Sequence, residues 1–166
     1  QRHSKQCQIR KGDPMFSKHQ LKPGEDVKLK KICADGKKLH EDRDEAEKEF
    51  KKLRKEFAEL QPALYAEGKQ KLLIVFQAMD AGGKDGTIRA VTQGVNPQGV
   101  NVVSFKAPSK RELAHDYLWR IHQAVPGAGK TTIFNRSHYE DVLIQRVHGW
   151  ISEEHAKKRI AAINAF

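Results

Sequence analysis

Apolar positions along the chain follow two kinds of spacing, and each kind predicts a different element. Between residues 46 and 64 they recur at steps of four, three, four, three and four, which places them on one face of a helix. The members of this apolar face are Ala46, Phe50, Leu53, Phe57, Leu60 and Leu64. We expect it to pack against a neighbouring sheet, the alternative being a dimer interface, and we expect Pro62 to kink or restart the helix.

Three short and continuous apolar runs follow at intervals of about 30 residues, over residues 72–76, 100–105 and 132–135. Runs of this length are typical of parallel strands that are buried on both faces. Helical patterns fill the gaps between them, and strands that alternate with helices at this spacing form βαβ units. The pattern predicts an α/β fold in three layers, with a parallel sheet and helices on both faces.

The helices after the second and third runs carry their own start signals. Ser109 and Ser137 are each followed three positions later by a glutamate, which is the pattern of a capping box. We expect the first box to open a helix that runs through Ile121 and the second to open a helix that ends near Val147. Ser152 is expected to cap a last helix.

Composition and charge narrow the choice of partners. The formal charge of +10 on 166 residues points to a polyanion, which is nucleic acid, acidic lipid or a phosphate polymer. The cysteines, Cys7 and Cys33, lack metal-ligand spacing, and no run approaches the roughly 20 apolar residues that span a bilayer. Without a visible signal peptide, we expect a cytoplasmic protein with no membrane partner.

A glycine-rich loop, Gln77–Thr87, joins the first predicted strand to its helix. Glycines let several N–H groups point into one concavity, the helix N-terminus adds partial positive charge, and a lysine there can reach a phosphoryl group. The loop departs from a strict Walker A sequence at Ala78 and at Asp85, so a plain glycine turn with a surface lysine is the alternative. The candidate phosphate- and nucleotide-binding residues are Gly82, Gly83, Lys84, Asp85, Gly86 and Thr87.

A second glycine–lysine stretch, Gly127–Thr132, precedes a predicted strand instead of following one. No helix N-terminus would then face a phosphate, so we interpret this stretch as a turn that leads into the third strand. The two stretches are alike in composition and differ in the type of element on their C-terminal side.

Polar residues at the end of the third predicted strand complete the candidate site. Ligands of parallel α/β sheets bind beyond the carboxyl ends of the strands. We expect this edge to bring together Asp80, Lys84, Asn135, Arg136 and Asp141. Two carboxylates beside a phosphate suit Mg²⁺-assisted phosphoryl transfer, because Mg²⁺ takes oxygen ligands and keeps several waters. Glu140 is interpreted as the far end of its capping box, and His138 as a local hydrogen-bonding residue rather than a base.

Five segments that include these residues resemble successive motifs of the family-2 polyphosphate kinases: residues 77–87, 95–100, 105–109, 115–120 and 133–141. The resemblance runs from about residue 22 to residue 166, in order and at matching spacing. It implies a thymidylate-kinase-like P-loop fold. It also implies reversible, Mg²⁺-dependent phosphoryl transfer between inorganic polyphosphate and a nucleoside mono- or diphosphate, in a homo-oligomer.

The resemblance further implies roles for single residues. Asp80 and Asp141 would hold the metal, and Lys84 and Arg136 would contact the transferring phosphates. The additional candidate phosphate contacts, with solvated surface charge as the alternative, are Lys106, Arg120 and Arg146.

Two expectations concern the chain as a whole. Residues 1–40 are rich in lysine, glycine and proline without sustained periodicity, so we expect an N-terminal extension before a P-loop-type phosphotransferase domain over residues 41–166. Family members continue beyond the last helix, so we expect this chain alone to leave one edge of the first strand unpaired and to lack transferase activity.

The alternative functions are an ATP-dependent nucleotide kinase and a basic nucleic-acid-binding module. The basic segments lack the interleaved aromatic residues that are typical of such a binding module.

Overall fold

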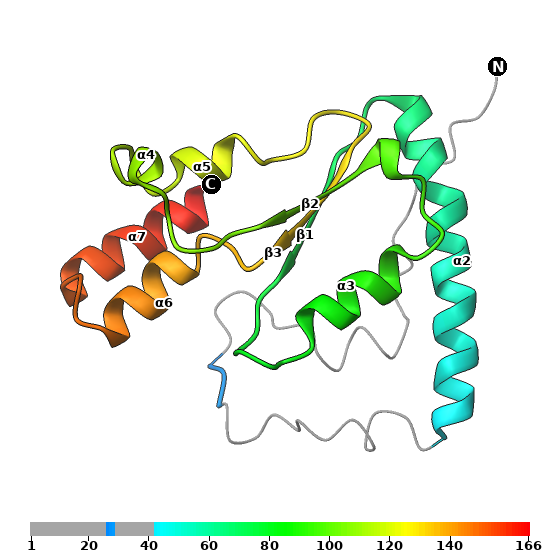
Figure 1. Ribbon diagram of the computed structural model, residues 1–166, viewed down its shortest axis with the longest axis horizontal. Helices are drawn as coiled ribbons and strands as arrows, with labels where there is room; N and C mark the ends of the chain where they lie inside the picture. The colour runs from blue at the N-terminus through cyan, green and yellow to red at the C-terminus, as the bar shows by residue number, and fades with distance from the viewer. Residues whose placement is uncertain (1–25, 29–41) are drawn as a thin grey trace. The chain divides into compact units, whose positions relative to one another are not determined.

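The computed structural model describes residues 26–28 and 42–166, so the expected N-terminal extension lies almost wholly outside the described residues. Residues 44–166 form one compact unit (Figure 1). The boundary between an extension and a domain near residue 40 therefore stays a prediction. Among the helices that the structure describes, none has both the length and the apolar composition that a membrane crossing requires.

A parallel sheet of three strands organises this unit, as the apolar runs predict. The strands are β1 (Leu72–Phe76), β2 (Val100–Ser104) and β3 (Thr131–Asn135), in the order β1-β3-β2. The register aligns Phe76, Asn135 and Ser104, so the three strands end side by side. The loops that follow them consequently leave the sheet at one common edge.

Burial differs between the central strand and its two neighbours. Ile133 and Phe134 of β3 are fully buried, whereas Leu72 of β1 and Val102 of β2 are exposed. The expected burial on both faces is therefore correct for β3 and wrong for the other two strands. The reason is their position, because within the described residues β1 and β2 each pair with β3 only.

Helices cover both faces of the sheet, which confirms the three-layer arrangement (Figure 1). On one face, Ile121 of α5 (Trp119–His122) packs with Phe105 and Phe134. The same side carries α6 (Glu140–Val147) and α7 (Glu153–Ala165), whose core residues include Val142 and Ile163. The other face is covered by α3 (Lys84–Thr92), through its buried residue Ile88.

The helix expected after the second strand is divided into two short helices. The capping box at Ser109 is present and opens α4, but α4 (Lys110–Leu113) ends after one turn. The side chain of Asp116 then accepts a hydrogen bond from the N–H of Leu118 at 2.8 Å, which starts a new turn before α5. The prediction of one continuous helix through Ile121 is wrong for this reason. Ser152 does cap α7, because its Oγ accepts from the N–H of His155.

The long helix α2 (Arg43–Glu67) continues through Pro62, so a restart there is wrong, and the alternative, a kink at Pro62, stays a prediction. Its apolar face does not pack on the sheet as expected, because Phe50, Leu53 and Leu60 are 39%, 45% and 65% exposed. The helix contacts the rest of the unit through Arg54, which donates to Gln93, and through Gln61, which lies against Gly99 in the short 3-10 helix η3 (Pro97–Gly99).

Candidate functional site

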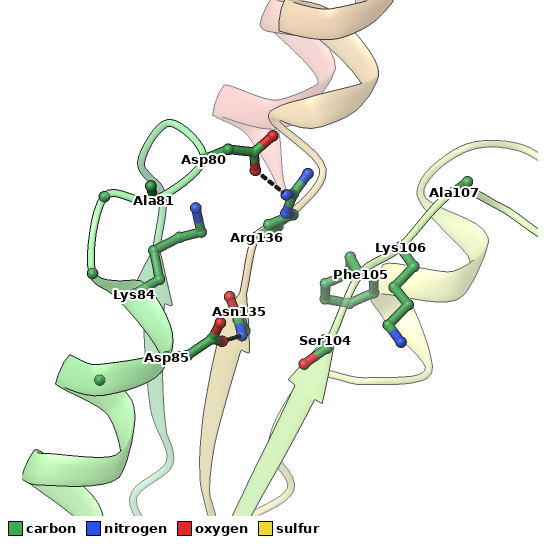
Figure 2. A pocket seen from close by; sticks show the side chains of 13 residues that line it. Asp80, Ala81, Lys84, Asp85, Ser104, Phe105, Lys106, Ala107, Asn135 and Arg136 are labelled. Carbon is green, nitrogen blue, oxygen red and sulfur yellow. Dashed lines mark hydrogen bonds and ion pairs between the residues drawn. The ribbon is translucent and has the colours of Figure 1, made fainter.

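A cavity of about 600 Å³ opens at the edge where the three strands end (Figure 2). The glycine-rich loop after β1, the first residues after β2 and the end of β3 form its walls. The predicted site residues that line it are Asp80, Gly82, Gly83, Lys84, Asp85, Gly86, Lys106, Asn135 and Arg136. The rule that ligands bind beyond the carboxyl ends of parallel strands therefore locates this cavity correctly.

The loop after β1 turns back on itself so that the N-terminus of α3 faces the cavity. Gly83 precedes the helix with φ 80°, in the left-handed region that glycine adopts without steric cost. Gly82 is needed for a different reason, since a Cβ there would lie 2.8 Å from the carbonyl oxygen of Met79. Ala81 has φ 60° despite its side chain, which is a locally strained conformation.

Lys84 is the first residue of α3, and its side chain lies over the loop. Its Nζ donates to the carbonyl oxygens of Ala78 at 2.7 Å and Met79 at 2.9 Å. The ammonium group therefore lies on the cavity side of the loop, near the Asp80–Arg136 pair (Figure 2). Thr87 does not line the cavity, and its Oγ1 donates back to the carbonyl of Gly83 at 3.0 Å.

Two side-chain contacts join the loop to the end of β3. Arg136 Nη2 forms an ion pair with Asp80, and Asn135 Nδ2 donates to Asp85 (Figure 2). The Asp80 side chain is 86% exposed, so this ion pair adds little to the stability of the fold. Its importance lies in placing a guanidinium and a carboxylate side by side at the mouth of the cavity.

Asp141, one of the two predicted metal ligands, lies apart from Asp80. It is 4% exposed, and its carboxylate accepts hydrogen bonds from Arg120 at 3.3 Å and Gln145 at 3.0 Å. Burial raises the pKa of Asp141 above its usual value, and the adjacent Arg120 offsets this shift only in part. The residue lines a separate cavity of about 160 Å³, so the structure does not bring the two predicted metal ligands together.

The three additional phosphate candidates have different surroundings. Lys106 lines the main cavity. Arg120 does not line it, and its Nη1 donates to the carbonyl oxygen of Lys106 at 2.9 Å, which holds the segment after β2. Arg146 is paired with Glu153 on the surface between α6 and α7, at 2.7 Å. Only Lys106 is therefore placed where it can contact a ligand of the main cavity.

The capping box predicted at Ser137 does not form. Tyr139 is the N-cap residue of α6 and makes no side-chain cap hydrogen bond. Glu140 instead accepts from Gln77 Nε2 at 2.7 Å, and Ser137 Oγ donates to Gln77 Oε1 at 3.1 Å. Gln77 is a residue that sequence reasoning missed, although a polar residue directly after an apolar strand was a signal for it.

His138 does not act as the predicted hydrogen-bonding residue at its Nδ1 atom. The side chain is buried, and Nδ1 has no hydrogen-bond partner within the described residues. Its ring stacks on Tyr139 with the centroids 4.8 Å apart, and burial lowers its pKa. These features give His138 a packing role.

Oxygen donors at the cavity suit a hard divalent cation. The carboxylates of Asp80 and Asp85 and the amide of Asn135 all line it. Mg²⁺ prefers such ligands and is bound through one or two carboxylates together with water and substrate phosphates. No group of three or more His, Cys, Asp or Glu residues that could hold a metal occurs in the described part of the chain, so a fully protein-made cage is not present there.

Known proteins resemble this chain in sequence and structure. The family model described as Polyphosphate kinase 2 (PPK2) matches residues 40–166. An AMP/ADP-polyphosphate phosphotransferase from Meiothermus ruber is 49% identical over 152 residues, which cover 91% of this chain and 57% of that protein. An ADP-polyphosphate phosphotransferase from Rhodopseudomonas palustris is 54% identical over 99 residues, which cover 60% of this chain and 34% of that protein.

The same likeness holds for solved structures. The crystal structure of Polyphosphate Kinase 2 from Arthrobacter aurescens TC1 matches with a TM-score of 0.74 and 40% identity, covering 88% of this chain and 53% of that one. A putative polyphosphate kinase 2 from Pseudomonas aeruginosa matches with a TM-score of 0.67 and 30% identity, covering 84% of this chain and 28% of that one. The chain therefore spans little more than half of the length of these relatives, or less.

Proposed function

Because this chain belongs to the polyphosphate kinase 2 family, we propose that it supplies the phosphate-binding part of an enzyme that transfers phosphoryl groups reversibly between inorganic polyphosphate and a nucleoside mono- or diphosphate. The observation that carries the proposal is the cavity at the ends of the three strands, where Lys84, Arg136 and the N-terminus of α3 meet. The names of the relatives from Meiothermus ruber and Rhodopseudomonas palustris support polyphosphate and AMP or ADP as the substrates.

In this reaction, a terminal phosphoryl group leaves the polyphosphate as its P–O anhydride bond breaks. A new P–O bond forms to a terminal phosphate oxygen of the nucleotide, and the shortened polyphosphate is released. Phosphoryl transfer depends mainly on positioning and on neutralising the charge of the transferring group. Lys84, Arg136 and the N–H groups of the glycine-rich loop provide positive charge for both tasks, and Lys106 extends the cationic wall.

We include Mg²⁺ in the proposal, with Asp80 as its protein ligand and with Asp85 and Asn135 as neighbouring oxygen donors. When bound, the metal would neutralise phosphate oxygens of the substrates. Asp141 stays a predicted second ligand, and this role requires that its contact with Arg120 open. Thr87, Arg120 and Arg146 stay predicted ligand contacts. Cytoplasmic location and a homo-oligomeric assembly of the full-length protein also belong to the proposal.

A donor competition assay tests this function. The protein, expressed from its complete reading frame, is offered polyphosphate or ATP as donor and AMP, ADP or GDP as acceptor, and the nucleotide products are separated by chromatography. We expect transfer from polyphosphate that requires Mg²⁺. Transfer from ATP alone would instead identify a nucleotide kinase. Preferential binding of single-stranded DNA over polyphosphate, without transfer, would identify a nucleic-acid-binding module.

A further inference from the structure

Gln77, which directly follows β1, uses both ends of its side-chain amide. Its Nε2 donates to Glu140 Oε1 at 2.7 Å, and its Oε1 accepts from Ser137 Oγ at 3.1 Å. The orientation of the amide follows from its partners, because a carboxylate can only accept hydrogen bonds. Ser137 Oγ also accepts from the N–H of Tyr139 at 3.2 Å. One side chain therefore joins the end of β1 to the start of α6.

The two segments that Gln77 joins carry adjacent walls of the phosphate cavity. The loop after β1 carries Asp80 and Lys84, and the end of β3 with the turn after it carries Asn135 and Arg136. Gln77 itself does not line the cavity. Ser137, its partner on the second wall, is fully buried and comes directly after Arg136. The position of Arg136 relative to the loop therefore depends on contacts that lie beneath the cavity.

Arg136 needs these contacts because of its backbone conformation. Its φ is 65°, in the left-handed region that residues with a Cβ rarely adopt. Such a conformation persists only where the surrounding structure holds it in place. The N–H of Arg136 donates to the carbonyl oxygen of Phe76 at 3.0 Å, which anchors the turn before the residue. The contacts of Gln77 with Ser137 and Glu140 anchor it on the other side.

We propose that Gln77 is a positioning residue, which holds the Arg136 guanidinium at the loop that carries Asp80 and Lys84. The role rests on the proposed phosphoryl transfer, in which Arg136 contacts the transferring phosphates. Gln77 acts only through the turn that contains Arg136. Its loss therefore changes the rate of transfer more than it changes the binding of polyphosphate, which many other cations of the chain support.

Exchanging the amide and the carboxylate tests this role. Gln77→Glu sets two carboxylates against each other. Glu140→Gln is the matched control, because Gln77 can still donate to an amide oxygen. The double variant Gln77→Glu/Glu140→Gln restores the hydrogen bond with donor and acceptor exchanged. All variants are made in the protein expressed from its complete reading frame, and their thermal unfolding is compared with that of the wild type.

We expect Gln77→Glu to lower kcat about 30-fold and to change KM for polyphosphate less than about 3-fold, since a misplacement of about 1 Å costs on the order of 100-fold in rate. Glu140→Gln should stay within about 3-fold of the wild type, and the double variant should recover to within about 5-fold. Gln77→Met, which keeps the side-chain length without hydrogen bonds, should show the same loss of kcat and replaces Gln77→Glu if that variant does not fold.

Hydrogen exchange of the Arg136 amide provides a readout that does not depend on activity. It should be at least about 10-fold faster in Gln77→Glu and return to the wild-type rate in the double variant. Absence of any transfer from polyphosphate by the wild type would refute the proposed function. The exchange rates would then still test whether Gln77 holds the turn that contains Arg136. Unchanged kcat and unchanged exchange in Gln77→Glu, or a double variant that recovers neither, would overturn the positioning role.

Discussion

The two glycine–lysine stretches of this chain have similar compositions and opposite surroundings. In residues 77–87 a strand comes first and α3 follows, so Lys84 lies at a helix N-terminus beside the cavity. In residues 127–132 the order is reversed, and Lys130 donates to the carbonyl oxygen of Gln98 at 2.7 Å and lies over the ring of Tyr65. The order of strand and loop, and not the glycine and lysine content, therefore decides whether the lysine lies at a helix N-terminus beside the cavity.

One glycine of each stretch is required by a close contact, but the contact lies in a different place in each stretch. Gly82 is required by the backbone of its own loop, because a Cβ would meet Met79 and Ala78. Gly129 has φ 78°, and its Cβ would lie 3.0 Å from the carbonyl oxygen of Tyr65 at the end of α2. The first glycine therefore shapes a loop that lines the cavity, and the second allows a helix to pack closely on a turn.

The largest expected effect separates the two lysines. Lys84→Ala removes a cation from the wall of the cavity, and we expect kcat for transfer from polyphosphate to fall about 100- to 1000-fold, the range found when one preorganised charge contact is lost. Lys130→Ala is the matched control and should stay within about 2-fold, because its ammonium contacts Gln98 and Tyr65 and does not line the main cavity. Steady-state kinetics give kcat for both variants. Equal losses of kcat would contradict the functional difference between the two lysines.

Gly82→Ala should have the next largest effect. The added methyl group would lie 2.9 Å from Ala78 Cβ, so the loop must shift. We expect a loss of about 10- to 100-fold in kcat/KM with polyphosphate, since small misplacements of a binding loop are costly. Gly127→Ala, at a glycine whose Cβ would meet nothing within 4 Å, serves as the control. A Gly82→Ala enzyme with wild-type kinetics would contradict the role given to this glycine.

Gly129→Ala should affect stability instead of rate. Alanine at φ 78° is strained, and its Cβ crowds the end of α2. We expect the free energy of unfolding to fall by about 1–3 kcal/mol, measured by urea denaturation, while kcat is unchanged at temperatures where the variant stays folded. Loss of activity without loss of stability would show that the second stretch takes part in the reaction after all.

The smallest expected effect is on the salt dependence of polyphosphate binding. Each phosphate neutralised by the protein should contribute about −0.7 to the slope of log affinity against log salt, taking the value for single-stranded nucleic acids. The wild type should show a slope of a few units, and Lys84→Ala should reduce it by about 0.7. Lys130→Ala should leave the slope unchanged. A flat response in the wild type would mean that the positive charge of the chain serves another partner.

The three strands could be predicted almost to the residue from the sequence. The runs 72–76, 100–105 and 132–135 correspond to β1 (72–76), β2 (100–104) and β3 (131–135). Short runs of mainly β-branched and aromatic residues mark strands even where one face is exposed, as at Leu72 and Val102. The cavity could be located from the same information, because the strand directions determine where the loops meet.

Two errors at the candidate site concern side chains whose partners lie outside their own element. The sequence pattern places Glu140 in a local capping box, but its partner Gln77 is 63 residues away in sequence. The pattern also predicts Asp141 beside Asp80, yet in α6 its carboxylate meets Arg120, which comes from α5. Local patterns cannot choose between a near and a distant hydrogen-bond partner, because both satisfy the same polar group.

The hydrogen bonds of Lys84 have a consequence for which anions can be captured. Its ammonium group is already bound to the carbonyl oxygens of Ala78 and Met79. An ammonium group has three N–H donors, so one donor stays available, and a singly charged ion such as chloride would gain this single contact. A ligand with closely spaced negative charges gains far more, because it attracts Lys84, Arg136 and the helix N-terminus at once. In the proposed function, this arrangement would favour dense polyanions over monovalent anions such as chloride.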